Sequence, residues 1–207
     1  MNKIKRALIS VSDKTGIIDF ASKLVKYNIE IISTGGTAKL LLENHIPHKH
    51  ISDITGMPEM LDGRIKTIHP KIHGGLLFKR NDPNHVSQMK EYGIQNIDMI
   101  VINLYPFEET IRKPNCTLND AIENIDIGGP ALIRAASKNH QFVSVITDQE
   151  DYELVLSELK TNQGSISIET NLKLATKAFH LTSHYDKLIH RYLFETATES
   201  KAKSSLF

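Results

Sequence analysis

The first 51 residues alternate between short buried runs and amphipathic segments, and this alternation limits the possible folds most strongly. Residues 6–11 are typical of a buried strand, and residues 29–33 and 46–51 are two further strand candidates. After the first strand, with Ser12 and Asp13 expected to start a helix, apolar residues recur at the helical period: Ile17, Phe20, Ala21 and Leu24. A second helix is expected around residues 38–42. Strands connected by helices run parallel with right-handed crossovers, so this region predicts an open parallel sheet.

The later segments extend the same pattern. Residues 97–104 are the strongest strand candidate, and residues 142–146 are a fifth. Further helices are expected at residues 117–124, which open with a capping box, at 131–138 after Pro130, at 149–160 after Asp148 and at about 168–194. We therefore predict a doubly wound, mostly parallel five-stranded α/β sheet with extra C-terminal helices, forming one domain over residues 1–194. Residues 195–207 are polar and are expected to be a frayed tail or a linker.

Composition and charge restrict the functional classes. The chain has 207 residues, 40% hydrophobic and 24% charged, with a mean hydropathy of −0.25, as in water-soluble globular proteins. A net charge of +1 argues against a general nucleic-acid-binding protein. The single cysteine, Cys116, cannot form an internal disulfide, so a reducing, cytoplasmic location is expected. Because no apolar stretch is long enough for a signal peptide or a membrane span, no membrane partner is expected.

Residues 63–75 concentrate cations and imidazoles between glycines. Arg64, Lys66 and Lys71 supply the positive charge, and His69 and His73 lie among them. With one proline and three glycines, the segment is expected to be neither a long helix nor a central strand. A loop this rich in donors is typical of one that faces an anionic ligand.

Polar residues also follow the first two predicted strands, where ligands bind to open parallel sheets. Ser10, Ser12 and Lys14 follow the first strand, with Lys14 expected at a helix N-terminus, and residues 34–37 (Thr34, Gly35, Gly36, Thr37) follow the second. Backbone N–H groups, hydroxyls and a lysine suit a phosphate dianion. A tight turn explains the adjacent glycines Gly35 and Gly36 as well as a phosphate site does. Since neither G-x-G-x-x-G nor a P-loop pattern occurs, dinucleotide or nucleoside triphosphate binding is not expected.

A third cluster surrounds residues 126–130. Asp126, Lys138, Tyr105 and Lys66 are predicted to reach one rim, where they would perturb one another's pKa values and move protons. The alternative is that Asp126 only caps a helix and that the two glycines only turn the chain. The pairs His69/His73 and His180/His184 lack the context of a metal site, so no metal is expected.

Six segments taken together resemble the IMP cyclohydrolase domain, the N-terminal part of the bifunctional purine-biosynthesis enzymes, over about residues 4–194. They are Leu-Ile-Ser-Val-Ser-Asp-Lys-Thr-Gly (8–16), Ser-Thr-Gly-Gly-Thr (33–37), Gly-Arg-Ile-Lys-Thr-Ile-His-Pro-Lys-Ile-His-Gly-Gly (63–75), Asn-Leu-Tyr-Pro-Phe (103–107), Ile-Asp-Ile-Gly-Gly-Pro (125–130) and Arg-Ala-Ala-Ser-Lys-Asn (134–139). The resemblance implies a methylglyoxal-synthase-like fold and ring closure of 5-formamidoimidazole-4-carboxamide ribonucleotide to IMP and water, without metal or cofactor. It also implies homodimers and a following transformylase domain. Since the chain stops at Phe207, formyl transfer is expected to reside elsewhere.

The resemblance also implies roles for individual residues. Ser10, Ser12, Lys14, Thr34, Gly36 and Thr37 would surround the substrate phosphate. Lys66 and Tyr105 would act at the formyl oxygen, and Asp126 and Lys138 would form a coupled pair that handles the carboxamide proton. Base and ribose would be held by Arg64, Thr67, Asn103, Ile127, Gly128 and Gly129, while His69 and His73 would shape the loop. Two alternatives stay open, a methylglyoxal-synthase-type lyase and a non-catalytic nucleotide-sensing module.

Overall fold

A single parallel sheet forms the centre of the molecule. The computed structural model describes residues 1–61 and 63–204, and its main sheet has five strands in the order β4-β3-β2-β5-β6. These are β2 (Arg6–Ser10), β3 (Glu30–Ser33), β4 (Lys49–His50), β5 (Met99–Ile102) and β6 (Ser144–Ile146), and each neighbouring pair is parallel. This arrangement confirms the predicted doubly wound sheet. A two-residue pair that the sequence did not indicate, β1 (Asn2–Lys3) with β7 (Ser165–Ile166), is antiparallel.

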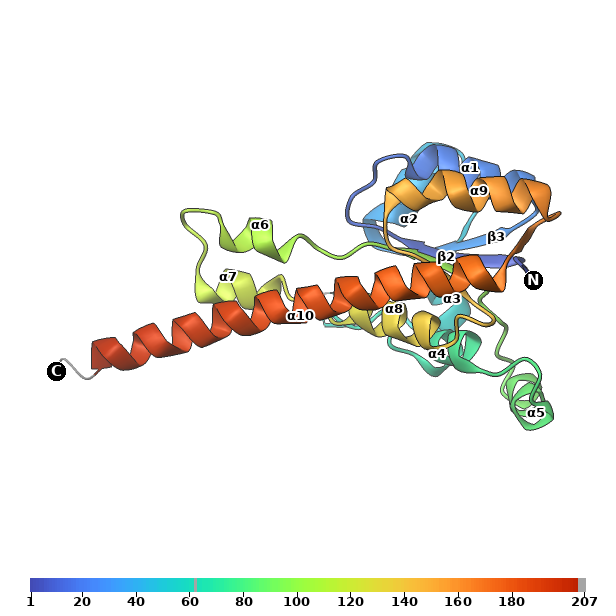
Figure 1. The fold of residues 1–207 in the computed structure, drawn as a ribbon. Helices are drawn as coiled ribbons and strands as arrows, with labels where there is room; N and C mark the ends of the chain where they lie inside the picture. The colour runs from blue at the N-terminus through green and yellow to red at the C-terminus, as the bar shows by residue number, and fades with distance from the viewer. Residues whose placement is uncertain (62, 205–207) are drawn as a thin grey trace.

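Helices cover both faces of the sheet (Figure 1). One face carries α1 (Ile17–Lys26), α2 (Gly35–Glu43) and α9 (Tyr152–Thr161), which follows the short 3-10 helix η1 (Gln149–Asp151). The other carries α3 (Ile51–Thr55), α4 (Pro70–Leu77), α8 (Gly128–Lys138) and α10 (Ile168–Ser204). The helices α5 (Pro83–Glu91), α6 (Phe107–Ile111) and α7 (Leu118–Glu123) lie farther out. Figure 1 shows α6 and α7 beside α10, beyond the end of the sheet.

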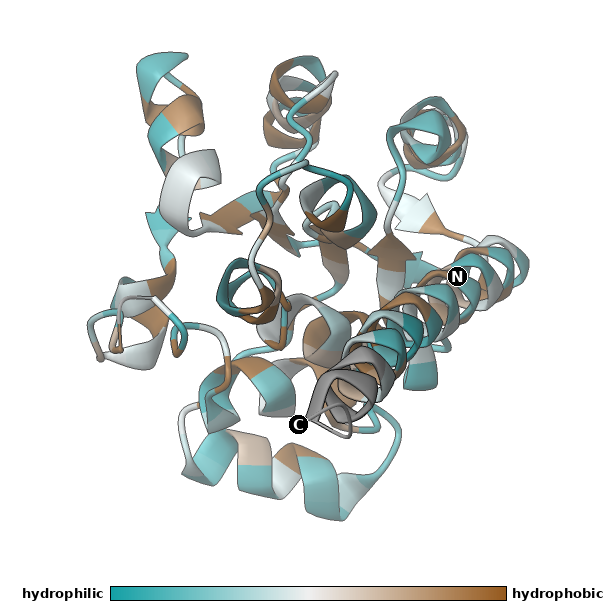
Figure 2. Cartoon of the chain, turned by 90° about the vertical axis from the view of Figure 1, so that its left-hand side faces the viewer, coloured by the Kyte–Doolittle hydropathy of each residue, from teal (hydrophilic) through white to brown (hydrophobic). Residues whose placement is uncertain are grey.

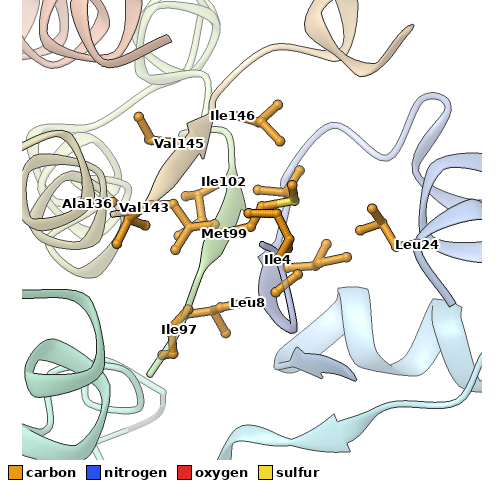
Figure 3. Packing of buried hydrophobic residues seen from close by; sticks show 14 of the residues in the cluster. Ile4, Leu8, Leu24, Ile97, Met99, Ile102, Ala136, Val143, Val145 and Ile146 are labelled. Atoms are coloured by element: carbon orange, nitrogen blue, oxygen red, sulfur yellow. The ribbon is translucent and has the colours of Figure 1, made fainter. Parts of the chain in front are cut away.

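Two hydrophobic clusters stabilise this arrangement. In the main cluster, Leu8, Ile100 and Val145 of three adjacent strands have no exposed surface, because strands covered on both faces bury every side chain (Figure 3). Figure 2 shows the hydrophobic segments gathered around the sheet and the hydrophilic ones on the outer sides of the helices. A second, smaller cluster lies between α6, α7 and α10 around Phe107, Ala121 and Tyr185. The segments that follow β5 are therefore supported by α10 as well as by the sheet.

Several helix starts differ from those that the sequence predicts. Helix α1 begins at Ile17 after Gly16, whose φ of 71° suits glycine, so Ser12 and Asp13 do not start it. The Asp13 carboxylate instead accepts the N–H of Thr15 within the preceding loop. Helix α8 begins two residues before Pro130. The third strand is shorter than predicted because the chain turns into α3 at Ile51.

Half of the 63–75 segment is a helix and not a loop. The Nδ1 atom of His69 accepts the N–H of Lys71 and caps α4, and Pro70 is the first helical residue, where its missing N–H costs nothing. Gly75 is needed inside this helix, since a Cβ there would lie 2.6 Å from the Gln95 carbonyl oxygen. Burial lowers the pKa of His73, which favours its neutral form. His69 therefore shapes this segment, as expected, whereas the same role for His73 stays a prediction.

Helix α10 is longer than predicted. It has 37 residues and continues through Ser204, whereas the sequence predicts a frayed tail from residue 195; residues 205–207 lie outside the described part of the chain. Residues 195–204 contain neither glycine nor proline, and Arg191 forms an i,i+4 ion pair of 2.8 Å with Glu195 across the predicted boundary. Within residues 1–61 and 63–204, no helix combines the length and apolarity that spanning a membrane requires.

Candidate active site

A cavity of about 1060 Å³ opens at the carboxyl ends of β2, β3 and β5. The chain leaves β2 toward β3 and β4 and later returns to β5 on the other side, so the cavity lies where the strand order reverses, the usual ligand site of such sheets. Sixteen of the seventeen residues predicted from the sequence line it: Ser10, Ser12, Lys14, Thr34, Gly35, Gly36, Thr37, Arg64, Lys66, Thr67, Asn103, Tyr105, Asp126, Ile127, Gly128 and Gly129. Residues far apart in the chain are thus brought to one hollow.

The N-terminus of α2 forms one wall of this cavity. Thr34 is the N-cap in extended conformation, and the first intrahelical bond from a backbone amide is donated by Ala38, so the three preceding amides are left without an intrahelical partner. Gly35 adopts a φ of +54°, and a Cβ at Gly36 would lie 3.8 Å from the Lys14 ammonium. Free amides beside a lysine are suited to binding a phosphate dianion.

Two of the predicted substrate contacts, Thr37 and Asn103, also hold the adjacent loop. The Thr37 hydroxyl accepts the N–H of Val11 at 3.0 Å and donates to its carbonyl oxygen at 3.1 Å. The Asn103 Oδ1 atom accepts the N–H groups of Ser12 and Asp13, and its Nδ2 donates to the Asp13 carbonyl oxygen. Asn103 therefore fixes the loop that carries Ser12 and Lys14. Lys14 lies within this loop, three residues before α1, and not at the helix N-terminus where it was expected.

Lys66 and Asp126 form the charged centre of the cavity. Burial raises the pKa of the Asp126 carboxyl, which the N–H of Gly129, the Lys66 ammonium and the N–H of Gly128 lower only in part. The Gly129 N–H donates to Asp126 Oδ1 at 2.9 Å, at the start of α8. Lys66 also approaches the cavity wall formed by the N-terminus of α2, because a Cβ at Gly35 would lie 3.7 Å from its ammonium. A carboxyl of raised pKa beside a lysine is a candidate for proton transfer.

The predicted pair of Asp126 with Lys138 is wrong in this structure. Lys138 is the last residue of α8 and is exposed, whereas Asp126 precedes the first turn. A rise of 1.5 Å per residue separates the two ends of this helix by roughly 15 Å. Among the described residues, the cation that acts on the Asp126 carboxyl is Lys66, and Lys138 does not line the cavity.

Other lining residues were missed from the sequence. Glu123 forms a 2.5 Å ion pair with Arg64 at the cavity mouth. Glu59 does not line the cavity, but it accepts a hydrogen bond from the hydroxyl of the lining residue Thr34 at 3.1 Å. Leu61 and Ile122 add apolar surface beside Tyr105 and Ile127, and all four are exposed: 66%, 46%, 54% and 63%. Only spatial proximity identifies these residues, since each lies in a segment without a distinctive motif.

The close approach of neighbouring side chains explains the two glycines that follow Ile127. A Cβ at Gly128 would lie 2.9 Å from the Thr67 hydroxyl, and one at Gly129 would overlap the Asp126 carboxylate. Gly128 therefore permits the contact with Thr67, and Gly129 leaves room for the Asp126 carboxylate. Among the described side chains, no group of three or more histidine, cysteine, aspartate or glutamate residues is placed to hold a metal ion.

Comparison with protein families matches the chain to two family models. Residues 16–131 match the MGS-like domain, and residues 136–206 match the AICARFT/IMPCHase bienzyme. The chain is 60% identical over 92% of its length to the "Bifunctional purine biosynthesis protein PurH" of Polynucleobacter necessarius subsp. necessarius, and 58% identical over 97% to that of Bacillus cereus (strain B4264). These alignments cover only 36% and 39% of the relatives, so the chain spans less than two fifths of their length.

A solved structure is also similar. The crystal structure of ForH superposes with a TM-score of 0.79 at 33% sequence identity, covering 90% of this chain and 97% of that one. The similarity thus includes nearly all of the fold, and the sequence matches extend over both parts of the chain. The chain belongs to the MGS-like domain family, and within it to the branch whose C-terminal part matches the AICARFT/IMPCHase bienzyme.

Proposed function

We propose that this chain is an IMP cyclohydrolase, which closes the ring of 5-formamidoimidazole-4-carboxamide ribonucleotide to give IMP and water. The observation that carries the proposal is a single cavity in which a helix N-terminus suited to phosphate adjoins Lys66 and a carboxyl of raised pKa, Asp126. The purine-biosynthesis relatives and the bienzyme match support the same reaction.

The phosphate of the substrate fits the wall formed by α2. Its oxygens would accept hydrogen bonds from the backbone N–H groups of residues 35–37, with Ser10, Ser12 and Lys14 on the opposite side. The ribose and base would then extend toward Thr67, Ile127 and the Gly128-Gly129 backbone, past the apolar surface at the cavity mouth. This orientation brings the formyl group to Lys66 and Tyr105, and the carboxamide to Asp126.

The reaction needs proton relays and alignment more than it needs a strong nucleophile. The carboxamide nitrogen bonds to the formyl carbon, the formyl oxygen becomes a hydroxyl, and this hydroxyl leaves as water while the C=N bond forms. Both protons of that water come from substrate nitrogens, so Asp126 accepts a proton from nitrogen, and Lys66 with Tyr105 stabilises and protonates the oxygen. Binding both ends of the nucleotide holds the two reacting groups together, which lowers the activation free energy by several kcal/mol.

The two alternatives are less well supported. A methylglyoxal-synthase-type lyase would use the phosphate wall but would leave the 63–75 segment and the bienzyme match over residues 136–206 unexplained. A nucleotide-sensing module would bind in the same cavity without turnover. The presence of a Lys66–Asp126 centre favours catalysis over sensing.

A turnover assay tests the proposal. The purified chain is incubated with the formylated carboxamide ribonucleotide, and ring closure is followed by its ultraviolet absorbance change. Single-turnover rates should fall by roughly 10²–10⁴ in Lys66→Ala. Lys71→Ala is the matched control, since this cation of the same segment does not line the cavity within the described residues. No rate above background in the unmodified chain would refute the proposal, and binding without turnover would favour a sensor.

The wider context is also a proposal. We infer a cytoplasmic protein that functions as a homodimer and is fused to a transformylase domain, as the bienzyme match and the purine-biosynthesis relatives favour. Light scattering on a size-exclusion column measures the mass directly. A mass of one chain at micromolar concentration would exclude a stable dimer of this part.

A further inference from the structure

Tyr185, in the middle of α10, contacts the backbone of Asp126. Its hydroxyl oxygen accepts the N–H of Asp126 at 2.8 Å, a contact between residues 59 positions apart in the sequence. The tyrosine is only 5% exposed, so the bond is shielded from solvent on the α10 side. This hydrogen bond is separate from the one between the Asp126 carboxylate and Gly129.

The ring of Tyr185 is held by the second hydrophobic cluster. It packs edge-to-face on Phe107 with ring centroids 6.2 Å apart, and both residues belong to one buried cluster with Ala121. Phe107 is 1% exposed and follows Tyr105 by two residues, and its N–H donates to the Tyr105 carbonyl oxygen at 2.8 Å. One side chain of α10 thus contacts Asp126 directly and the Tyr105 segment through Phe107.

The direction of the Asp126 carboxylate depends on its backbone. The carboxylate bends back to Gly129, and the space for this bend exists only because residue 129 has no Cβ. A rotation of the Asp126 peptide plane would swing the carboxylate away from Lys66. The hydrogen bond from the Asp126 amide to Tyr185 therefore restrains this geometry together with the bond from Gly129 to the carboxylate.

We propose that Tyr185 is a positioning residue that fixes the Asp126 backbone, and with it the Asp126 carboxylate, for proton transfer. The inference rests on the proposed function and deepens it. Tyr185 lies outside residues 16–131, the MGS-like match, and inside residues 136–206, the bienzyme match. The long helix α10, which runs alongside α8 in Figure 1, thus adds to the MGS-like match a contact with Asp126.

The test compares two tyrosines of the same helix. Tyr185→Phe removes the hydroxyl and keeps the ring on Phe107. Tyr192→Phe is the matched control, because Tyr192 also packs edge-to-face on Phe107, with centroids 5.9 Å apart, and its hydroxyl has no hydrogen-bond partner among the described residues. We expect Tyr185→Phe to lower the single-turnover rate by roughly 10- to 100-fold with KM little changed, and to alter its pH profile, since small displacements of reacting groups have effects of this size. Tyr192→Phe should retain the unmodified rate and profile.

A second measurement is independent of turnover. Hydrogen exchange of the Asp126 amide, followed by NMR in both variants, should become at least tenfold faster in Tyr185→Phe and should be unchanged in Tyr192→Phe. Unmodified activity in Tyr185→Phe, or equal losses in the two variants, would overturn the positioning role. If the unmodified chain shows no turnover, the proposed function fails. In that case, an unchanged exchange rate of the Asp126 amide in Tyr185→Phe would overturn the hydrogen bond between Asp126 and Tyr185 itself.

Discussion

Charged groups differ in their surroundings between the two ends of the same parallel sheet: one end buries and pairs a carboxylate, whereas the other faces an open cavity. At the amino end, Asp98 precedes β5 and has no exposed side-chain surface, yet its carboxylate accepts the N–H groups of Lys5 and Arg6 and pairs with Arg80 at 2.9 Å. Asn96 donates to the same carboxylate. Each acceptor oxygen of this buried group therefore has a donor, which is the condition under which a buried charge is tolerated.

At the carboxyl end, charges face an open cavity. The amides that begin α2 have no intrahelical carbonyl, and Asp126 is held by glycine amides with Lys66 as the cation that acts on it. Folding raises the pKa of Asp126, so its ionised form is disfavoured in the folded protein. The comparison teaches that one end of the sheet satisfies its polar groups internally, whereas the other leaves them for a ligand.

The largest expected effect is a loss of activity without a loss of stability, at the carboxyl end of the sheet. Asp126→Asn should lower the single-turnover rate by roughly 10²–10⁴, because the proton acceptor is lost. A carboxyl whose pKa is raised by folding destabilises the folded state once the pH exceeds the pKa of that carboxyl in the unfolded chain. At pH 7 the free energy of unfolding of Asp126→Asn should therefore be equal to or higher than that of the unmodified chain. Urea unfolding and the turnover assay measure the two quantities.

The control for this variant is Glu109→Gln, an exposed carboxylate at the same end of the sheet that does not line the main cavity. It should retain full activity. A marked loss of stability in Asp126→Asn would show that the carboxyl end is stabilised in the same way as the amino end.

The amino end should show the converse. Asp98→Ala leaves the Arg80 guanidinium and two backbone amides without their acceptor, and breaking a buried pair costs about 3–5 kcal/mol of unfolding free energy. The rate per folded molecule at low temperature should be unchanged. Glu30→Ala provides the graded control at the same end, since this carboxylate is 30% exposed and should matter less. Equal losses in the two variants would contradict the role assigned to the buried carboxylate.

A smaller effect concerns the phosphate wall. Lys14→Ala should raise KM by roughly 10- to 100-fold and leave kcat nearly unchanged, because a charged hydrogen bond of about 1.5–3 kcal/mol is lost equally from ground and transition states. Lys39→Ala is the matched control, since Lys39 lies on α2 but is 79% exposed and outside the cavity. A defect in kcat alone would remove Lys14 from uniform phosphate binding.

The smallest effect is expected at the cavity mouth. Glu123→Gln removes an exposed ion pair with Arg64, so the free energy of unfolding should change by less than about 1 kcal/mol. Because Arg64 is then free to meet substrate, KM should fall slightly or stay constant. A several-fold rise in KM would mean that Glu123 itself contacts the substrate, and calorimetric titration with IMP would show the same loss.

Most of the sheet could be predicted from the sequence, because buried parallel strands read as continuous apolar runs. The runs around Leu8, Ile31 and Ile100 each became a central strand. Element ends were less accurate: α1 starts at Ile17 because Gly16 in a left-handed conformation precedes it, and α4 forms where the glycines indicated a loop. In these places tertiary contacts, such as that of Gly75 with Gln95, outweigh local propensity.

The candidate site was predictable to the extent that it follows strands. Ser12 and Thr34 come directly after predicted strands and Asn103 lies near the end of another, and such positions meet at one edge. Lys138 was misplaced because the direction of α8 carries it away from Asp126. Tyr185 was missed because a tyrosine on a long amphipathic helix reads as core packing, and its partner is 59 residues earlier.

The sequence by itself determined the parallel sheet, the polar residues that follow β2 and β3, and the residue types that surround the cavity. These follow from local rules: the period of apolar residues and the position of polar residues at strand ends. Only the tertiary structure decided which cation acts on Asp126, that Asn103 and Thr37 hold a loop, and that α10 contacts Asp126 through Tyr185. Such contacts join segments that are distant in sequence, and their geometry is set by the packing of whole helices, which no local pattern encodes.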